Sequence, residues 1–160
     1  QGELGCTPLQ MANLAAIIAN RGYYYIPHIV KDSEEVTIDE KYKEKKYTMV
    51  DTEHFPKIIK GMYKAVHSSK EDGATAYIAN VPGLEICGKT GTAQTGMLGS
   101  DHGAFVCFAP AEDPEIAICV YGEKAAHGAT LGLCAKSIIQ YYFDNNDEVG
   151  SVVAYENTLG

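Results

Sequence analysis

The sequence predicts an α+β fold in which an antiparallel sheet is flanked by helices. Three segments carry apolar residues at helical spacing: one after Thr7, one from about Asp51, and one over Thr130–Phe143. Between the second and the third, three short apolar runs bounded by turn-forming residues follow in quick succession, which is typical of an antiparallel meander. A length of 160 residues suits a single domain.

The first helix has clear boundaries in the sequence. Thr7 supplies an N-cap hydroxyl, Pro8 occupies the first helical position and Gln10 the third, which together make a capping box with a favoured proline. The apolar residues that then recur at helical spacing are Met11, Leu14, Ala15 and Ile18. Gly22 stands where a C-cap glycine is expected.

The region between the first two helices is predicted to be mostly irregular. Tyr23–Val30 is aromatic and β-branched, so we expect a strand or extended segment, and Pro27 favours a sheet edge. Lys31–Lys46 is a mixed-charge stretch that predicts a surface hairpin or loop. The second helix begins near Asp51 or Thr52, and its core-facing stripe is Phe55, Ile58, Ile59, Met62, Tyr63 and Val66.

The second half of the chain contains the predicted sheet. Residues 73–79 predict a short helix ahead of a Pro82-Gly83 turn. The predicted strands are Leu84–Thr92, Ala104–Ala109 and Glu115–Tyr121. We expect the last helix, Thr130–Phe143, to turn Leu131, Cys134, Ile138 and Tyr142 inward, and residues 144–160 to form a polar, loosely ordered tail.

Composition excludes several classes of function. The net charge of -8 argues against nucleic acid and against an anionic membrane surface as partners, because both would be repelled. Five cysteines form an odd set without a Cys-x-x-Cys pair, so a complete disulfide framework or a zinc site is disfavoured, and we expect no metal or cofactor. Four of the five lie in apolar runs, which predicts buried free thiols. The chain begins with Gln1 rather than Met, so we interpret it as a piece of a longer polypeptide.

The most informative motif is the tetrad Lys89-Thr90-Gly91-Thr92 at the end of the first predicted strand. A strand edge with a cation, two hydroxyls and glycines can bind an anionic, peptide-like ligand in extended form. Residues 83–90 also satisfy the P-loop pattern GxxxxGK[ST], so a nucleotide-binding site is an alternative. That alternative is disfavoured, because Gly91 and Gly96 make a poor start for the helix that a P-loop requires.

Three segments in order carry a resemblance to a known family. They are Gln1–Glu3 with Thr7–Gln10, then Gly88–Gln94, then Phe105–Pro110. The chain resembles class B penicillin-binding proteins, and within them the elongation type. The resemblance implies a partial penicillin-binding/β-lactamase-like transpeptidase fold, with residues 1–143 as the C-terminal half of the transpeptidase domain and residues 144–160 as the tail.

The same resemblance implies a function for the parent protein. It would be a serine-type peptidoglycan D,D-transpeptidase that binds D-Ala-D-Ala stem peptides, is trapped by β-lactams, and is anchored at the outer, periplasmic face of the cytoplasmic membrane. Lys89 would assist proton transfer beside the nucleophile, and the hydroxyls of Thr90 and Thr92 would receive the donor's carboxylate. The Thr92 N–H would be an oxyanion-hole donor, and Gly91 would let the substrate backbone come close.

The departures from the family pattern set limits on this chain. No serine begins a Ser-x-x-Lys or Ser-x-Asn motif. Tyr155-Glu156-Asn157 has the form of a variant of Ser-x-Asn, but it follows the Lys-Thr-Gly strand and so does not replace the Ser-x-Asn motif. We therefore expect this fragment alone to be soluble and inactive. Gly103-Ala104 stands where a tryptophan is common, which predicts a looser pocket rim. A β-lactamase or β-lactam sensor, or a non-catalytic scaffold, stays open as an alternative.

The resemblance also predicts an open sheet edge. The family fold has five strands, and the segment upstream of this chain would supply those beyond Glu115–Tyr121. Exposed strand edges recruit partners, so we expect self-association through that strand or an altered arrangement of the segment before it.

Overall fold

The computed structural model describes residues 4–95, 101–125 and 128–145. Its helices and strands are, in chain order, α1 (Pro8–Ala19), β1 (Tyr23–Tyr24), β2 (Lys46–Tyr47), α2 (Phe55–His67), β3 (Cys87–Ala93), β4 (His102–Ala109), β5 (Ile116–Gly122) and α3 (Gly128–Asp144). Short 3-10 turns occur at Glu40–Tyr42, Thr52–His54 and Tyr77–Ala79. Among the described residues, no helix is long and apolar enough to cross a membrane.

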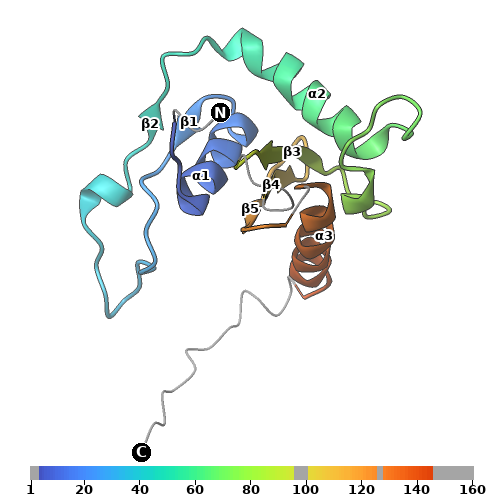
Figure 1. Cartoon of the computed structure of the whole chain (residues 1–160). Coiled ribbons are helices and arrows are strands. Elements are labelled where there is room, and N and C mark those ends of the chain that lie inside the picture. The colour runs from blue at the N-terminus through green and yellow to red at the C-terminus, as the bar shows by residue number, and fades with distance from the viewer. Residues whose placement is uncertain (1–3, 96–100, 126–127, 146–160) are drawn as a thin grey trace, which may run out of the picture.

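The centre of the molecule is an antiparallel sheet in the order β3-β4-β5 (Figure 1). Thr90 lies opposite Phe105 across the first strand pair, and Cys107 lies opposite Ile118 across the second. The strands follow one another along the chain and in the sheet, so the predicted meander and the α+β class are confirmed.

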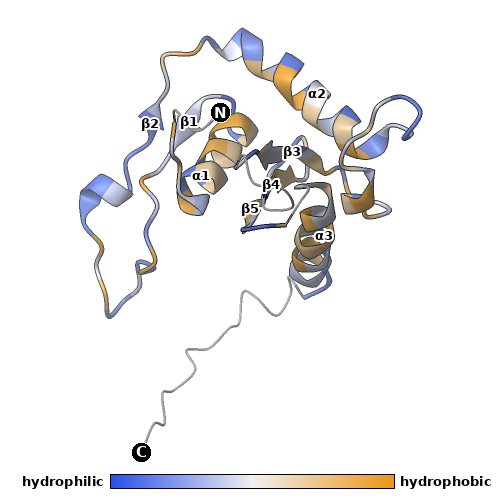
Figure 2. Cartoon of the chain, in the orientation of Figure 1, coloured by the Kyte–Doolittle hydropathy of each residue, from blue (hydrophilic) through white to orange (hydrophobic). Residues whose placement is uncertain are grey.

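The sheet has a hydrophobic core on each face, because side chains of β4 alternate between the faces. The α3-side core contains Val66, Ala76, Ala79, Val81, Ile86, Phe105, Cys107, Ala109, Ala135 and Ile139. The α1-side core contains Ala19, Phe55, Ile59, Met62, Cys87, Phe108 and Ala111. Helix α2 contributes to both cores, and hydrophobic and hydrophilic residues alternate along its ribbon (Figure 2).

The start of α1 follows the sequence closely, whereas its end differs by one residue. The Gln10 N–H donates to the Thr7 hydroxyl at 3.2 Å and the Thr7 N–H donates to the Gln10 side chain at 2.8 Å, which confirms the capping box. At the end, Arg21 rather than Gly22 takes the left-handed C′ position, with φ of 56°. The Gly22 N–H donates to Ile17 O at 2.9 Å, which completes a Schellman motif.

Gly22, which follows the C′ residue Arg21, is favoured both by its φ of +113° and by its close packing. A Cβ built there would lie 3.0 Å from the Phe55 ring, so the Phe55 side chain would have to shift to accept one. Gly22 therefore contributes to the end of α1, as the sequence predicts, and it also makes a close contact with Phe55.

The region between α1 and α2 has less strand than its composition predicts. Of the strand or extended segment predicted over 23–30, only Tyr23–Tyr24 is strand and pairs with Lys46–Tyr47, and the predicted loop over 31–46 is confirmed. Asp32 organises that loop, because its carboxylate accepts the Ile38 N–H at 3.1 Å and pairs with Lys43 at 2.9 Å. The Lys43 ammonium, with the Ile38 N–H, lowers the pKa of Asp32.

Some of the apolar residues that recur at helical spacing are exposed. Leu14 on α1 is 45% exposed and Ile58 on α2 is 43% exposed, while α1 buries Ala15 and Ala19. The tail beyond Asn145 and the opening Gln1–Glu3 lie outside the described residues.

The predicted inward face of α3 is correct only in part, because Leu131 packs against the α3-side core and Tyr142 is half-buried. Cys134 and Ile138 are exposed, and the buried residues are Gly128, Gly132, Ala135 and Ile139. A Cβ on Gly132 would lie 3.2 Å from the side chains of Ala79 and Ile78, so small residues allow α3 to approach the preceding turn. Leu131 and Phe143 also pack against the α3-side core as partly buried side chains.

Candidate active site

The predicted site residues lie together on the exposed part of β3. The strand starts buried, since Cys87 and Gly88 pack under α2, and it becomes accessible from Lys89 onward. Lys89, Thr90, Gly91 and Thr92 are successive residues of the strand and pair with Val106, Phe105, Ala104 and Gly103 of β4. Among the described residues, β3 has a strand neighbour on one side only, so its other edge can pair with an extended ligand.

Side-chain alternation divides the tetrad between two sides of the strand. Thr90 and Thr92 point to the side of the α3-side core, and Lys89 points to the other side. The Lys89 ammonium donates to the Thr90 carbonyl oxygen at 2.6 Å, and it forms no ion pair with any described residue. Its positive charge is therefore not neutralised by a carboxylate within the described part of the chain.

Thr90 has a side-chain partner that the sequence did not indicate. Its hydroxyl lies 3.3 Å from the hydroxyl of Thr75, which precedes the Tyr77–Ala79 turn. Thr75 belongs to no motif considered in the sequence, and fifteen residues separate it from Thr90. Only the packing of this segment beside β3 brings the two hydroxyls together.

Gly128 brings the start of α3 close to Gly91 of the site strand. A Cβ built on Gly128 would collide with the carbonyl oxygens of Gly91 and Ala104, so the start of α3 lies directly against the backbone of β3 and β4. A Cβ on Gly91 would meet only Ala104, at 3.7 Å, which is an ordinary contact. Within the described structure, no packing forbids a side chain at Gly91.

The expected looser rim at Gly103-Ala104 is not found at Gly103. This residue is buried, and a Cβ there would lie 3.1 Å from the Gly128 nitrogen and from the Leu131 side chain. The start of α3 therefore fills the space beside Gly103.

The P-loop alternative is contradicted by the secondary structure. Gly88, Lys89 and Thr90 lie inside β3 and pair with β4, so no helix begins at the Lys-Thr pair. The backbone N–H groups of a helix N-terminus, which would bind phosphate in a P-loop, are consequently missing from this motif.

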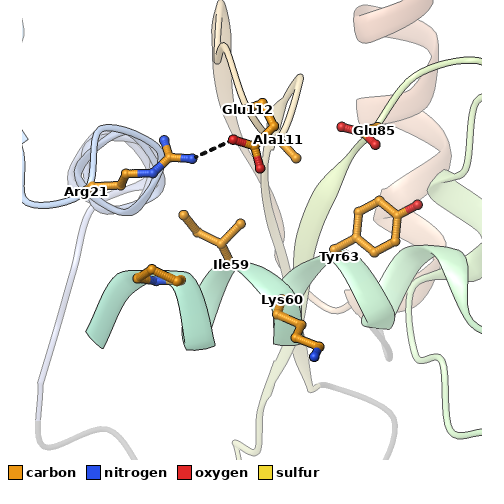
Figure 3. Close-up of a pocket in the computed structure, with 8 residues that line it drawn as sticks. Arg21, Ile59, Lys60, Tyr63, Glu85, Ala111 and Glu112 are labelled. Atoms are coloured by element: carbon orange, nitrogen blue, oxygen red, sulfur yellow. Dashed lines mark hydrogen bonds and ion pairs between the residues drawn. The ribbon is translucent and has the colours of Figure 1, made fainter. Parts of the chain in front are cut away.

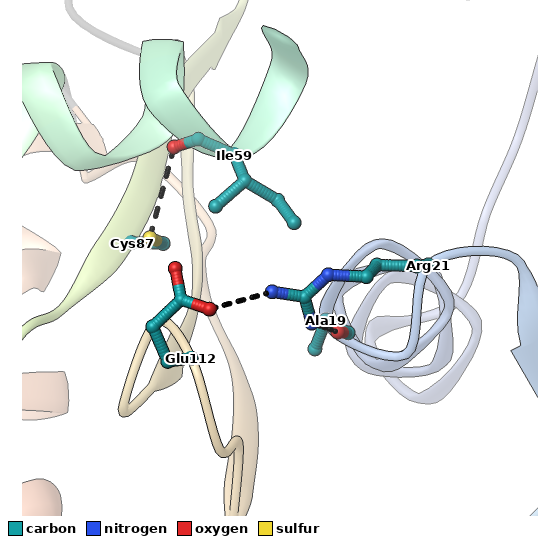
Figure 4. Close-up of polar contacts among 5 residues, drawn as sticks. All are labelled: Ala19, Arg21, Ile59, Cys87 and Glu112. Atoms are coloured by element: carbon teal, nitrogen blue, oxygen red, sulfur yellow. Dashed lines mark hydrogen bonds and ion pairs between the residues drawn. The ribbon is translucent and has the colours of Figure 1, made fainter. Parts of the chain in front are cut away.

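The cysteine next to the tetrad is structural. Cys87 is fully buried, its thiol donates to the Ile59 carbonyl oxygen at 3.7 Å, and burial raises the pKa of the thiol to about 12 (Figure 4). A thiol with this pKa is protonated at neutral pH and is a poor nucleophile. Among the described residues, no group of three or more His, Cys, Asp or Glu side chains could hold a metal ion.

A separate pocket of about 440 Å³ lies between the end of α1, α2 and the β4–β5 connection (Figure 3). Arg21 pairs with Glu112 across it at 3.3 Å, and Ile59 and Tyr63 of α2 line it. The tetrad does not contribute to its lining, so this pocket and the β3 edge are distinct features.

Residues 1–140 match the family described as the penicillin binding protein transpeptidase domain. The chain belongs to this family. The match confirms the resemblance that the Lys-Thr-Gly tetrad and its flanking segments indicated. A transpeptidase domain with the tetrad on an exposed edge strand accounts for both the sequence motif and the accessible stretch of β3.

Curated relatives support the same conclusion. The chain is 32% identical over 159 residues to the peptidoglycan D,D-transpeptidase MrdA of Acinetobacter baumannii, covering 89% of this chain and 23% of the relative. It is 33% identical over 146 residues to the peptidoglycan D,D-transpeptidase PbpA of Mycolicibacterium smegmatis, covering 86% of this chain and 28% of that relative. The chain thus spans about a quarter of the length of these relatives.

Solved structures of penicillin-binding proteins share the fold. Penicillin-binding protein A from M. tuberculosis, in an imipenem acyl-enzyme complex, is 28% identical with a TM-score of 0.70, over 89% of this chain and 32% of that one. PBP2 of Pseudomonas aeruginosa, in complex with WCK 5153, is 31% identical with a TM-score of 0.68, over 89% of this chain and 30% of that one. The fold of this chain therefore agrees with that of experimentally determined family members.

Proposed function

We propose that this chain is part of a serine-type peptidoglycan D,D-transpeptidase of cell-wall synthesis, in which β3 forms the ligand-binding wall of the active site. The exposed Lys89–Thr92 stretch on an unpaired strand edge is the observation that carries the proposal. Family membership and the names of the relatives support it.

In this proposal the reaction has two steps. A serine outside this chain attacks the carbonyl of a D-Ala-D-Ala stem peptide and expels the terminal D-Ala. An amine of a neighbouring stem then attacks the acyl-enzyme, which forms the cross-link and frees the serine. β-Lactams acylate the same serine because they mimic the donor.

Each tetrad residue has a proposed part in those steps. The Lys89 ammonium stabilises negative charge beside the nucleophile and assists proton transfer. The Thr90 and Thr92 hydroxyls bind the ligand carboxylate. The Thr92 N–H donates to the oxyanion, a contact worth about 2.7–4 kcal/mol in comparable sites. Gly91 leaves room for the ligand backbone.

The proposal extends to the organisation of the protein. Residues 1–143 would form the C-terminal half of the transpeptidase domain, and residues 144–160 the tail. The whole protein would be membrane-anchored, with this domain at the outer face of the cytoplasmic membrane. Stem peptides and β-lactams would be its ligands, in keeping with the acyl-enzyme complex of the M. tuberculosis relative.

We also propose that the 160-residue chain, by itself, self-associates through β5. Among the described residues this strand pairs only with β4. Its sequence, Ile116–Gly122, contains no charged residue and no proline, which are the usual devices that protect a sheet edge. A second copy of the strand would satisfy the unpaired backbone groups.

The decisive experiment is covalent labelling with a fluorescent penicillin. The longest natural polypeptide that contains this chain should be labelled, and the 160-residue chain alone should not, because it lacks Ser-x-x-Lys. Lys89→Ala in the longer protein should slow labelling by about 100-fold or more, the usual size of a proton-transfer contribution. Lys60→Ala, which removes an exposed lysine from α2, is the matched control and should label normally.

The same experiment separates the alternatives. Rapid loss of the label with release of hydrolysed penicillin would favour a β-lactamase. A longer protein that is never labelled would favour a non-catalytic scaffold. Normal labelling of Lys89→Ala would refute the role given to Lys89.

A further inference from the structure

The backbone on both sides of Thr75 is held in place at the side of the site strand. The residues on either side of it are buried, Ala74 at 6% and Ala76 at 0% exposed. Their N–H groups donate to Ser69 O at 3.2 Å and to Ala65 O at 2.9 Å, so the backbone on both sides of Thr75 is fixed to the end of α2. Thr75 itself is exposed and its hydroxyl reaches Thr90 at 3.3 Å.

When a carboxylate binds to Thr90, the number of hydroxyl protons decides which of Thr75 and Thr90 donates to the other. Each hydroxyl carries one proton and can accept two hydrogen bonds. A carboxylate only accepts, so Thr90 must use its single proton for a ligand carboxylate. Thr90 can then keep its contact with Thr75 only as an acceptor, and Thr75 must become the donor.

We propose that Thr75 is a positioning residue for the ligand carboxylate. Its hydroxyl donates to Thr90, and Thr90 donates to the carboxylate. The chain of two hydrogen bonds holds the β-branched side chain of Thr90 in one rotamer and polarises its hydroxyl toward the ligand. This inference rests on the proposed function, because it assumes that Thr90 binds a carboxylate.

The test uses acylation of the longer transpeptidase by two matched ligands. One is a penicillin with its free carboxylate, and the other is the methyl ester of the same penicillin, which lacks the charged acceptor. The second-order rate constant of acylation is measured for wild type, Thr75→Val, Thr75→Ser and Thr75→Ala. Thr37→Val, at an exposed threonine in the loop between β1 and β2, is the control.

We expect Thr75→Val to slow acylation by the carboxylate ligand about three- to tenfold, the effect of losing one hydrogen bond. Acylation by the ester should change by less than about twofold. Thr75→Ser keeps the hydroxyl and should retain the wild-type rate. Thr75→Ala should slow acylation as much as the loss of the hydroxyl in Thr75→Val, and it replaces Thr75→Val as the test if valine disturbs folding. Thr75→Val in a Thr90→Val background should have no further effect, because the partner is already missing.

Three results would overturn the inference. They are wild-type rates for Thr75→Val with the carboxylate ligand, equal slowing with both ligands, and additive effects of Thr75→Val and Thr90→Val. A wild-type protein that no penicillin acylates would instead refute the proposed function, and the inference with it. The two failures are distinguished by the wild-type measurement alone.

Discussion

Gly88 and Gly91 lie three residues apart on β3 and lack side chains for different reasons. A Cβ on Gly88 would lie 2.7 Å from the Phe105 ring and 3.1 Å from Val66, inside the α3-side core. A Cβ on Gly91 would meet nothing closer than Ala104 at 3.7 Å. Packing therefore requires glycine at 88, whereas any requirement at 91 must come from the ligand.

This contrast predicts opposite outcomes for two alanine substitutions. Gly88→Ala should lower the free energy of unfolding by about 1–3 kcal/mol, the usual cost of overpacking a core. Gly91→Ala should change it by less than about 0.5 kcal/mol, yet slow penicillin acylation of the longer protein. Denaturant unfolding and acylation rates measure the two effects. A Gly91→Ala protein that is acylated normally would remove the ligand argument for this glycine.

The buried thiols predict a loss of stability at alkaline pH. Burial raises the pKa of Cys107 to about 12, from 9.0 for an ordinary thiol. Between these values the unfolded chain has lost the proton and the folded chain keeps it, so the free energy of unfolding falls as pH rises. Cys107→Ala should make that fall shallower, whereas Cys134→Ser, at an exposed thiol, should leave it unchanged. Identical slopes for both variants in pH-dependent unfolding would contradict this.

Cysteine burial could be predicted only in part from the sequence. Cys87 and Cys107 are buried as expected, and Cys119 is half-buried, but Cys134 is exposed. An apolar run indicates that a segment touches the core, and in a helix it does not say which side does.

At the scale of elements, the start of α3 and the site strand depend on each other. Gly128 allows the helix to lie against the carbonyl oxygens of Gly91 and Ala104. The same contact fills the space beside Gly103. A helix displaced from this position would therefore disturb the backbone of the tetrad.

Gly128→Ala tests this dependence. The added methyl group has no flexible side chain to displace, because its neighbours are backbone atoms, so we expect a loss of about 1–3 kcal/mol in stability. Amide NMR shifts of Gly91 and Ala104 should change more than those of β5. The matched control is Gly61→Ala on α2, where a Cβ meets nothing within 4 Å and helix propensity favours alanine. A Gly128→Ala protein as stable as Gly61→Ala would contradict the close contact.

Elements with strong local signals were predictable, and those set by packing were not. The capping box of Thr7 and Gln10, the proline in the first turn of α2 and the three strands of the meander were all correct. Strand pairing over 23–30 is limited to Tyr23–Tyr24, because aromatic and β-branched residues favour an extended backbone without guaranteeing a partner. Arg21 takes the left-handed position expected for a glycine, and Gly22 follows it at a point where a Cβ would lie 3.0 Å from the Phe55 ring.

For the whole molecule, the unprotected edge of β5 predicts association that salt strengthens. The chain carries a net charge of -8, so repulsion between copies opposes pairing and screening weakens that repulsion. Light scattering should show a mass that rises with protein concentration, and more steeply at higher ionic strength. A monomer at every concentration would refute the pairing.

A charge at the edge should abolish this association. Tyr121 lies on β5 and is 45% exposed, so Tyr121→Lys places a cation on this edge strand, and two paired copies would bring two such cations to the same interface. Tyr141→Lys makes the same change on the exposed side of α3 and serves as the control. If the chain still associates with Tyr121→Lys but not with Tyr141→Lys, the copies associate through α3 and the proposed pairing through β5 is wrong.

The sequence by itself determined the order of helices and strands, the family, and the tetrad Lys89–Thr92 as the candidate site. These depend on caps, periodicity and a motif, which are properties of neighbouring residues. The tertiary structure decided which face of α3 is buried, which of the two β3 glycines is required by the core, and that Thr75 meets Thr90. Those features depend on contacts between segments far apart in the chain, and such contacts are set by how side-chain volumes fit together.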